Sequence, residues 1–258
     1  MSTILFEDVV FGPIKSRRLG TSLGINLSPK HGKWCSFDCI YCECGFNKDG
    51  KQDTRIPTVE EFRTALEIKL KEIAADNTHI DSITFSGNGE PTLHPHFKEV
   101  IEHTVALRDH FCKNAVITVF TNGSQLDKES VRDALKMVNN PTIKIDSPLE
   151  WFVNMVDRPN EQYSLAKTID NIKLFNGNFV LQTMFLKGTM GGKHFDSCCR
   201  ENVEAWIKLV RELKPRSIMM YTIDRETPAK GLEKVTAEQM ESIAKPLIDE
   251  GFEIQIRG

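Results

Sequence analysis

The sequence predicts an α/β fold built around a parallel β-sheet. Short apolar runs alternate with amphipathic helical patterns from about residue 21 onward, and this alternation is typical of repeated βα units. The apolar runs are brief and nearly continuous, as expected of strands whose two faces are both buried. With 258 residues, the chain is long enough for one such domain with a large core.

We count six βα units along the chain. The predicted strands are, in order, residues 22–27, 82–86, 115–120, 142–146, 179–186 and 217–223. Residues 252–256 are a candidate for a final strand. Because strands in βα units are parallel, we expect their carboxyl ends to lie together at one edge of the sheet.

Capping boxes mark two of the helix starts. Thr58 is followed by Glu61, and Thr236 by Gln239, so that each pair can satisfy backbone groups of a first helical turn. Helical spacing also groups apolar residues into faces that we expect to pack on the sheet. These residues are Phe62, Leu66 and Ile73 early in the chain, and Val203, Trp206, Ile207 and Val210 later.

Two predicted connections stand out by their length or composition. Residues 28–57 carry no convincing helix or strand pattern, and loops of that length inside a compact domain are usually functional. Residues 187–196 contain Gly188, Gly191 and Gly192, which predict a flexible connection after the fifth strand. This second connection is either a mobile lid over a substrate or a permissive surface loop.

The composition narrows the class of protein. A formal net charge of −3 gives no global field that attracts nucleic acid, although the basic residues near the amino terminus form a local patch. The first residues do not read as a secretory signal, and no apolar run is long enough to span a membrane. The seven cysteines are unevenly placed and do not suggest a disulfide framework, so we expect a reducing cytoplasm and no membrane association.

Three cysteines lie in the long connection, at the carboxyl end of the first predicted strand, where α/β barrels place their active sites. Cys35, Cys39 and Cys42 can bind three irons of a 4Fe-4S cluster and leave the fourth iron without a protein ligand. Such an open iron is a binding site, as in catalytic metal centres generally. A zinc site is the alternative, but the second pair of ligands that zinc sites usually have is missing. Cys44 either supplies a fourth ligand to the cluster or lies beside the cluster without binding it.

This motif, with Tyr41 before its last cysteine, resembles the signature of the radical S-adenosylmethionine (SAM) superfamily. The resemblance implies a partial, open TIM-like barrel, with a 4Fe-4S cluster and SAM at the carboxyl edge of the strands. It also implies that the open iron chelates SAM, and that an electron from the cluster cleaves SAM to methionine and a 5′-deoxyadenosyl radical. The protein itself is then expected to position the reactants.

A second segment resembles the GGE motif of the same superfamily. Gly87, Asn88, Gly89 and Glu90 follow the second predicted strand. Glycine allows backbone groups to approach a ligand closely, and Glu90 is a suitable acceptor for the ammonium group of SAM. An ordinary turn is the alternative interpretation. Resemblance extends the expected SAM pocket to further strand ends, at Asn122, Asp146, Gln182, Tyr221 and Ile223, together with Tyr41.

Segments outside the cysteine motif resemble the wyosine-synthetase-like, or Fe–S oxidoreductase, group of the superfamily. They are residues 11–20, 23–29 and 221–225. This resemblance implies that the substrate is tRNA or another nucleotide-containing molecule, although the cysteines of a second cluster are missing. Arg17 and Arg18 either bind a substrate phosphate or carboxylate, or tie the amino-terminal segment to the barrel.

The leading hypothesis is therefore an enzyme that abstracts a hydrogen atom from a substrate that the sequence does not identify. A protein- or peptide-modifying activase is a second hypothesis, and a non-catalytic Fe–S electron-transfer module is a third. We expect a monomer that receives electrons from a donor such as a flavodoxin or ferredoxin. We expect one core domain over residues 1–258, with an amino-terminal extension at 1–20 and a cluster-binding loop at 28–57.

Overall fold

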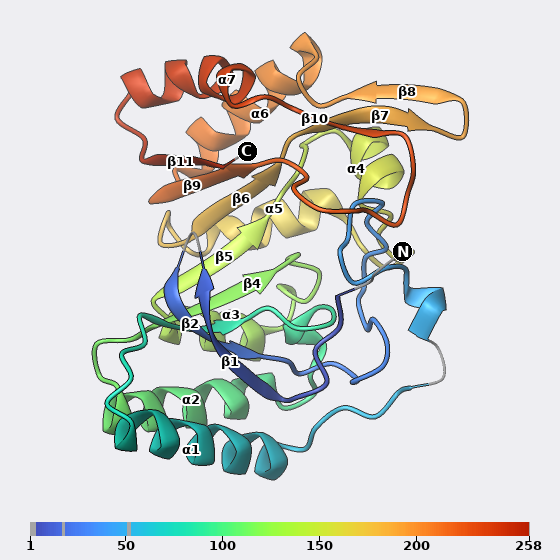
Figure 1. The fold of residues 1–258 in the computed structure, drawn as a ribbon. Coiled ribbons are helices and arrows are strands. Elements are labelled where there is room, and N and C mark those ends of the chain that lie inside the picture. The colour runs from blue at the N-terminus through green and yellow to red at the C-terminus, as the bar shows by residue number, and fades with distance from the viewer. Residues whose placement is uncertain (1–3, 17–18, 51–52, 258) are drawn as a thin grey trace.

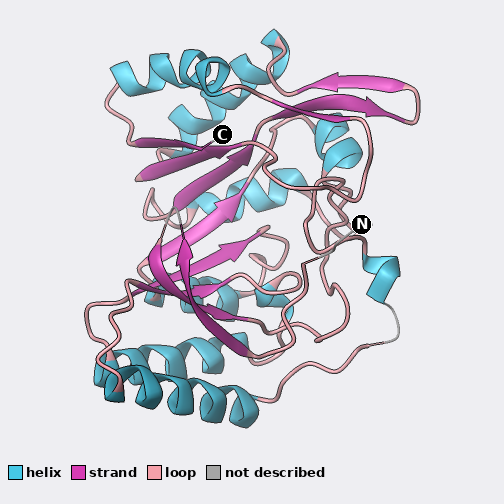
Figure 2. Cartoon of the chain, in the orientation of Figure 1, coloured by secondary structure: helices cyan, strands magenta, loops and turns pink. Residues whose placement is uncertain are grey.

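The computed structural model describes residues 4–16, 19–50 and 53–257. Its main sheet has the strand order β1-β2-β3-β4-β5-β6-β9-β11, and its helices cover one side of that curved sheet (Figures 1 and 2). The strands are β1 (Val10–Ser16), β2 (Gly20–Ile25), β3 (Ser82–Phe85), β4 (Val116–Thr121), β5 (Asn140–Lys144), β6 (Val180–Met184), β9 (Ser217–Tyr221) and β11 (Ile254–Arg257). The seven predicted strands are thus confirmed, with ends shifted by a few residues.

The sheet is parallel from β2 to β11, and only β1 runs antiparallel to its neighbour β2. β1 and β11 form its two edges, so the barrel is open, as the resemblance implied. Sequence reasoning assigned no strand before residue 22. β1 lies in the predicted amino-terminal extension, where Gly12 and Pro13 interrupt the apolar pattern.

The helices connect successive strands. They are α1 (Val59–Ala75), α2 (Phe97–Phe111), α3 (Glu129–Met137), α4 (Glu150–Val156), α5 (Leu165–Lys173), α6 (Arg200–Leu213) and α7 (Ala237–Asp249), with short 3-10 turns η1 (Asn47–Gly50) and η2 (Pro91–Leu93). Both predicted capping boxes form, at the starts of α1 and α7. Of the predicted helix faces, Phe62, Leu66, Ile73, Trp206 and Val210 are buried in the core, while Val203 and Ile207 pack against it partly exposed.

Residues 187–196, predicted to be a loop, form regular structure instead. β7 (Leu186–Met190) and β8 (Lys193–Asp196) form an antiparallel hairpin, and β10 (Leu232–Lys234) pairs with β7 to complete a second, three-stranded sheet. Gly191 and Gly192 both have positive φ, which a tight two-residue hairpin turn requires. The glycines therefore build a turn, and the hairpin extends away from the barrel (Figure 1).

The arrows of β4, β5 and β6 point toward the side of the molecule where the loop of residues 28–57 lies (Figure 1). This placement agrees with the expectation that the cysteine motif lies at the carboxyl edge of the sheet. Among the described residues, no helix combines the length and the apolar character needed to cross a membrane.

Candidate active site

The loop of residues 28–57 packs tightly against the segment that follows β3. Trp34 N donates a hydrogen bond to Asn88 O (2.9 Å), and Glu90 N donates one to Trp34 O (3.1 Å). A parallel bridge therefore joins Trp34 and Gly89. A Cβ atom on Gly89 would lie 1.8 Å from Trp34 O, so glycine is required there by contact with the loop itself.

The side chain of Asn88 ties the amino-terminal segment to the same loop. Its Nδ2 donates to Phe6 O (2.8 Å) and Pro29 O (2.9 Å), while its Oδ1 accepts from Phe6 N (2.7 Å). Asn26 Oδ1 accepts from Asn88 N (2.9 Å), and a Cβ atom on Gly87 would lie 2.1 Å from that oxygen. The fully buried amide of Asn88 thus supports the loop.

Burial lowers the pKa of Lys33, but negative charge on Cys42, Cys35 and Cys39 outweighs this effect and raises the pKa above its usual value. Phe37 N donates a hydrogen bond to Cys35 Sγ (3.4 Å). Within residues 4–16, 19–50 and 53–257, no three His, Cys, Asp or Glu side chains are arranged to hold a single metal ion. A cubane cluster does not need that arrangement, because each thiolate binds a separate iron.

The environments of the four loop cysteines differ. Burial raises the pKa of Cys35 to about 12, although Lys33 opposes this, and burial also raises the pKa of Cys39 well above its usual value. The pKa of Cys42 is lowered to about 6 because it shares a hydrogen bond with the Cys44 thiol, whose own pKa that bond and burial raise. Cys42 therefore has the most thiolate character, and the thiolate is the form that binds metal.

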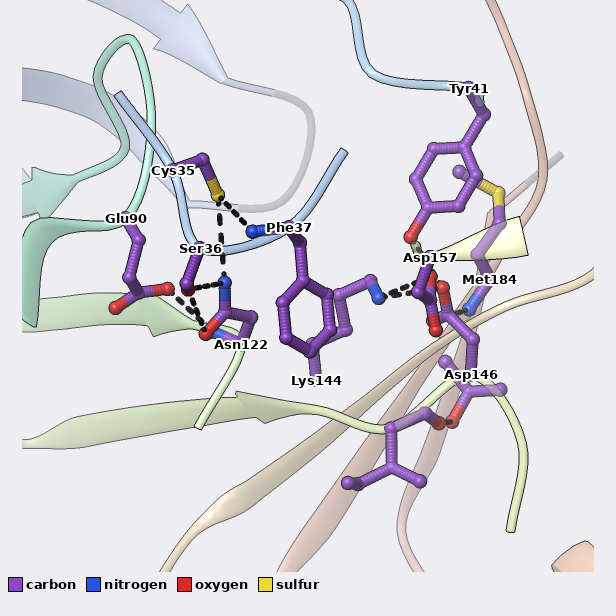
Figure 3. A network of polar contacts seen from close by, with 12 residues as sticks. Cys35, Ser36, Phe37, Tyr41, Glu90, Asn122, Lys144, Asp146, Asp157 and Met184 are labelled. Carbon is purple, nitrogen blue, oxygen red and sulfur yellow. Dashed lines mark hydrogen bonds and ion pairs between the residues drawn. The ribbon is translucent and has the colours of Figure 1, made fainter. Parts of the chain in front are cut away.

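Glu90 is buried, and its carboxylate accepts hydrogen bonds from several groups of its own chain. Figure 3 shows its link to Asn122. Oε1 accepts from Thr92 Oγ1 (2.5 Å) and Thr121 Oγ1 (2.7 Å), and Oε2 accepts from Asn122 N (2.7 Å). Burial nevertheless raises the pKa of Glu90 above its usual value. Asn122 in turn extends its Nδ2 to within 3.5 Å of Cys35 Sγ. Glu90 and Asn122 thus link the ends of β3 and β4 to the first cysteine.

A buried ionic network lies on the other side of the cysteine loop (Figure 3). Lys144 Nζ is 3.0 Å from Asp146 Oδ2 and 2.6 Å from Asp157 Oδ1. Tyr41 donates a short hydrogen bond to Asp146 Oδ2, and Met184 N donates to Oδ1 (2.9 Å). Burial alone would lower the pKa of Lys144, but Asp146 and Asp157 raise it well above the usual value. Sequence reasoning missed Asp157, which follows a short helix and belongs to no motif.

The same region holds the backbone of the cysteine loop. Ile40 N donates to Val156 O (2.9 Å), and Asn160 N donates to Ser36 O (2.8 Å). The ring of Phe37 lies under Lys144, whose Nζ is 5.0 Å from the ring centroid. The last residue of α4 and the segment after it therefore fix the central part of the motif.

A cavity of about 450 Å³ opens inside the barrel, next to the cysteine loop. Most of the residues predicted to contact SAM line this cavity, and Cys42 lies in its wall with them: Tyr41, Gly87, Gly89, Gln182, Tyr221 and Ile223. The other predicted residues, Asn88, Glu90, Asn122 and Asp146, are buried behind this wall and bonded as described above. Arg17 and Arg18 lie outside the described residues.

Charged residues line the mouth of this cavity. Arg225 from the segment after β9 pairs with Glu43 from the cysteine loop, with Nη1 and Oε2 2.7 Å apart. Arg257, on the edge strand β11, also lines the cavity and is exposed. Cys112, Cys198 and Cys199 lie outside this site: Cys112 follows α2, and the other two precede α6.

The chain matches a known protein family. A family model described as "Radical SAM superfamily" matches residues 30–194. The chain is 31% identical over 242 residues to a protein of Brachyspira hyodysenteriae named GTPase Obg, covering 92% of this chain but only 33% of that protein. It is 29% identical over 226 residues to a UPF0026 protein of Helicobacter pylori, covering 86% and 68% of the two chains. A radical SAM methyltransferase from Sphaerobacter thermophilus has a similar fold, with a TM-score of 0.65 at 17% identity over 92% of this chain and 66% of that one.

Proposed function

Because this chain belongs to the radical SAM superfamily, we propose that it is an enzyme in which Cys35, Cys39 and Cys42 hold a 4Fe-4S cluster beside a SAM pocket in the barrel cavity. The observation that carries this proposal is the shared cavity wall. Cys42 and Tyr41 of the cysteine motif face the same space as Gly87 and Gly89 of the second motif, although the two motifs are more than forty residues apart.

The donor chemistry of the loop fits the proposed cluster. The three cysteines lie on one short segment that also carries the buried Lys33, and the lowered pKa of Cys42 favours its thiolate. Backbone hydrogen bonds to Asn88 on one side and to Val156 on the other hold this segment in place. The thiols are thus presented by a fixed backbone, as a bound cluster requires.

When bound, the cluster and SAM supply the electron and the 5′-deoxyadenosyl radical with which we expect a hydrogen atom to be taken from the substrate. The residues of this chain position the reactants. Tyr41 is fixed at the cavity wall by its hydrogen bond to Asp146, and Gln182 contributes a polar side chain from β6. Tyr221 and Ile223 offer a flat and partly apolar surface to the adenine, which limits the access of water.

In this proposal, the buried residues of the predicted pocket support the residues that line the cavity. Glu90 and Asp146 place the strand ends and Tyr41, and Asn122 contacts Cys35. Direct contacts between these side chains and SAM stay predictions, because their polar atoms already bind groups of the protein.

For the substrate we propose a nucleotide-containing molecule such as tRNA, on the basis of the resemblance to the wyosine-synthetase-like group. Arg257 at the cavity mouth supports this choice, since a guanidinium suits a phosphate. We further propose that the chain works as one core domain and receives electrons from a flavodoxin or ferredoxin. The chain spans only a third of the Brachyspira relative, so these assignments concern this chain alone.

The test is anaerobic reconstitution with iron and sulfide, reduction by dithionite with SAM present, and chromatography for 5′-deoxyadenosine. We expect the product from the natural chain and from Cys112→Ala, because Cys112 lies at the end of α2 outside the site. Cys35→Ala, Cys39→Ala and Cys42→Ala should each abolish it. A reconstituted cluster that never cleaves SAM would instead support the electron-transfer module.

A further inference from the structure

The inner part of the barrel cavity carries a chain of three hydroxyl groups from β2 and β3. Ser22 and Thr84 line the cavity and are 4% and 3% exposed. Ser22 Oγ lies 2.8 Å from Thr84 Oγ1, and Thr84 Oγ1 lies 3.2 Å from Ser82 Oγ. Ser82 Oγ donates a hydrogen bond to Leu19 O (3.2 Å), which closes the chain at a backbone carbonyl.

The bond to Leu19 O fixes the direction of the other two bonds. A hydroxyl group has one proton to donate and two lone pairs that accept. Because Ser82 gives its proton to Leu19 O, its bond with Thr84 needs the proton of Thr84 Oγ1. The bond between Thr84 and Ser22 then needs the proton of Ser22 Oγ. Ser22 Oγ therefore meets the cavity with lone pairs alone, and no group of residues 4–16, 19–50 or 53–257 donates to it in this arrangement.

Ser22 lies deep in this cavity, whereas Arg257 lies at its mouth. β2 ends at Ile25, and a strand rises about 3.3 Å per residue, so Ser22 is placed roughly 10 Å below the strand end from which the cysteine loop departs. Arg257 is the last residue of β11 and pairs with Tyr221 at the end of β9, and both line the cavity. The cavity therefore combines a cation near the strand ends with an acceptor further inside the barrel.

We propose that Ser22 Oγ binds an amino group of a nucleotide base that enters this cavity, while Arg257 binds the phosphate. This inference rests on the proposed function, because it concerns the nucleotide-containing substrate proposed there. An amino group fits Ser22 because its N–H donates to a lone pair. To bind an oxo group instead, Ser22 would have to withdraw its proton from Thr84, and one bond of the chain would be lost. Phe120 and Tyr221 also line the cavity, and aromatic side chains suit the flat face of a base.

The test is isothermal titration calorimetry of the reconstituted full chain, saturated with SAM under anaerobic conditions and without a reductant. The probes are two pairs of nucleotides whose members differ by one amino group. The pairs are guanosine and inosine 5′-monophosphate, and adenosine and purine riboside 5′-monophosphate. Ser22→Ala removes the acceptor. Ser217→Ala is the matched control, because Ser217 begins β9 and lies outside the cavity wall.

We expect the natural chain to bind the amino member of at least one pair about 5-fold more tightly or better, as one hydrogen bond allows. Ser22→Ala should bring this ratio close to one, whereas Ser217→Ala should keep it. Arg257→Gln should weaken both members of the pair about 10-fold without changing their ratio, because they share the phosphate.

Three results would overturn the inference. They are equal affinities within both pairs, an undiminished preference in Ser22→Ala, and no measurable binding of any of the four nucleotides. A weaker affinity for SAM in Ser22→Ala, with the nucleotide ratio unchanged, would assign Ser22 to SAM and overturn it as well. If Ser22→Ala does not fold, Ser22→Cys replaces it under the same criteria, since a thiol is a weak acceptor.

These outcomes are separable from those of the proposed function, which is read from 5′-deoxyadenosine. A chain that cleaves SAM but shows no preference for the amino group keeps the proposed function and loses the role of Ser22. If no cluster forms, the same titration is made on the iron-free chain. A preference that depends on Ser22 there, without 5′-deoxyadenosine, would keep the nucleotide site and remove the radical chemistry.

Discussion

Replacing Gly89 by alanine should damage the site by displacing the cysteine loop. The new Cβ atom would lie 1.8 Å from Trp34 O, and contacts below 3.0 Å are essentially never observed, so the loop backbone must move by about an ångström. That movement disrupts the bonds from Trp34 N to Asn88 O and from Glu90 N to Trp34 O. Loss of a hydrogen bond costs about 1 kcal/mol of stability, and up to ~3 kcal/mol where a buried group is left without a partner. For the two bonds together, we expect Gly89→Ala to lower the free energy of unfolding by ~2–4 kcal/mol.

The assay is urea unfolding of the iron-free protein under reducing conditions, together with iron content after reconstitution. Gly191→Ala is the control, because Gly191 has a positive φ but no atom within 4 Å of its would-be Cβ. We expect the control to cost about 1–2 kcal/mol through backbone strain and to keep its iron. If Gly89→Ala kept both natural stability and full iron content, the tight contact with Trp34 would have no role in holding the loop.

Two further changes test the interior. Lys144→Met leaves the carboxylates of Asp146 and Asp157 buried without their cation. Urea unfolding should therefore show a free energy of unfolding lower by ~3–5 kcal/mol. An unchanged free energy of unfolding would mean that the three side chains do not stabilise one another. Burial lowers the pKa of His94 below its usual value, while His94 Nε2 donates a hydrogen bond to Pro57 O (2.9 Å). As the pH falls through about 6.5, the unfolded chain therefore takes up this proton first, and stability should fall. His94→Gln should show a smaller decline with acidification, and equal slopes would refute the assignment.

Much of the scaffold is readable from local sequence patterns. The parallel strands follow from their apolar runs, and the capping boxes at Thr58 and Thr236 form as predicted, because both signals depend on neighbours in the chain. Local signals misled at residues 187–196. There the pair Gly191 and Gly192 also fits a tight hairpin turn, and the pairing of β10 with β7 involves residues about forty positions away.

The site is only partly readable for the same reason. The spacing of the cysteines identifies the motif, and Tyr41 within it lines the barrel cavity. Sequence reasoning explained Gly89 by close approach of a ligand, whereas in the structure the close neighbour is Trp34 of the same chain. The network of Lys144 and Asp157 joins segments that no motif connects, so only the fold shows it.

The ties of the cysteine loop also bear on the durability of the site. Asn88, Val156 and Asn160 hold the loop through its backbone, and these bonds do not involve a thiol. If the proposed cluster lost its iron, these bonds would therefore still hold the backbone of the loop. We therefore expect iron and sulfide to rebuild the proposed cluster on a loop that is already formed, without unfolding of the chain.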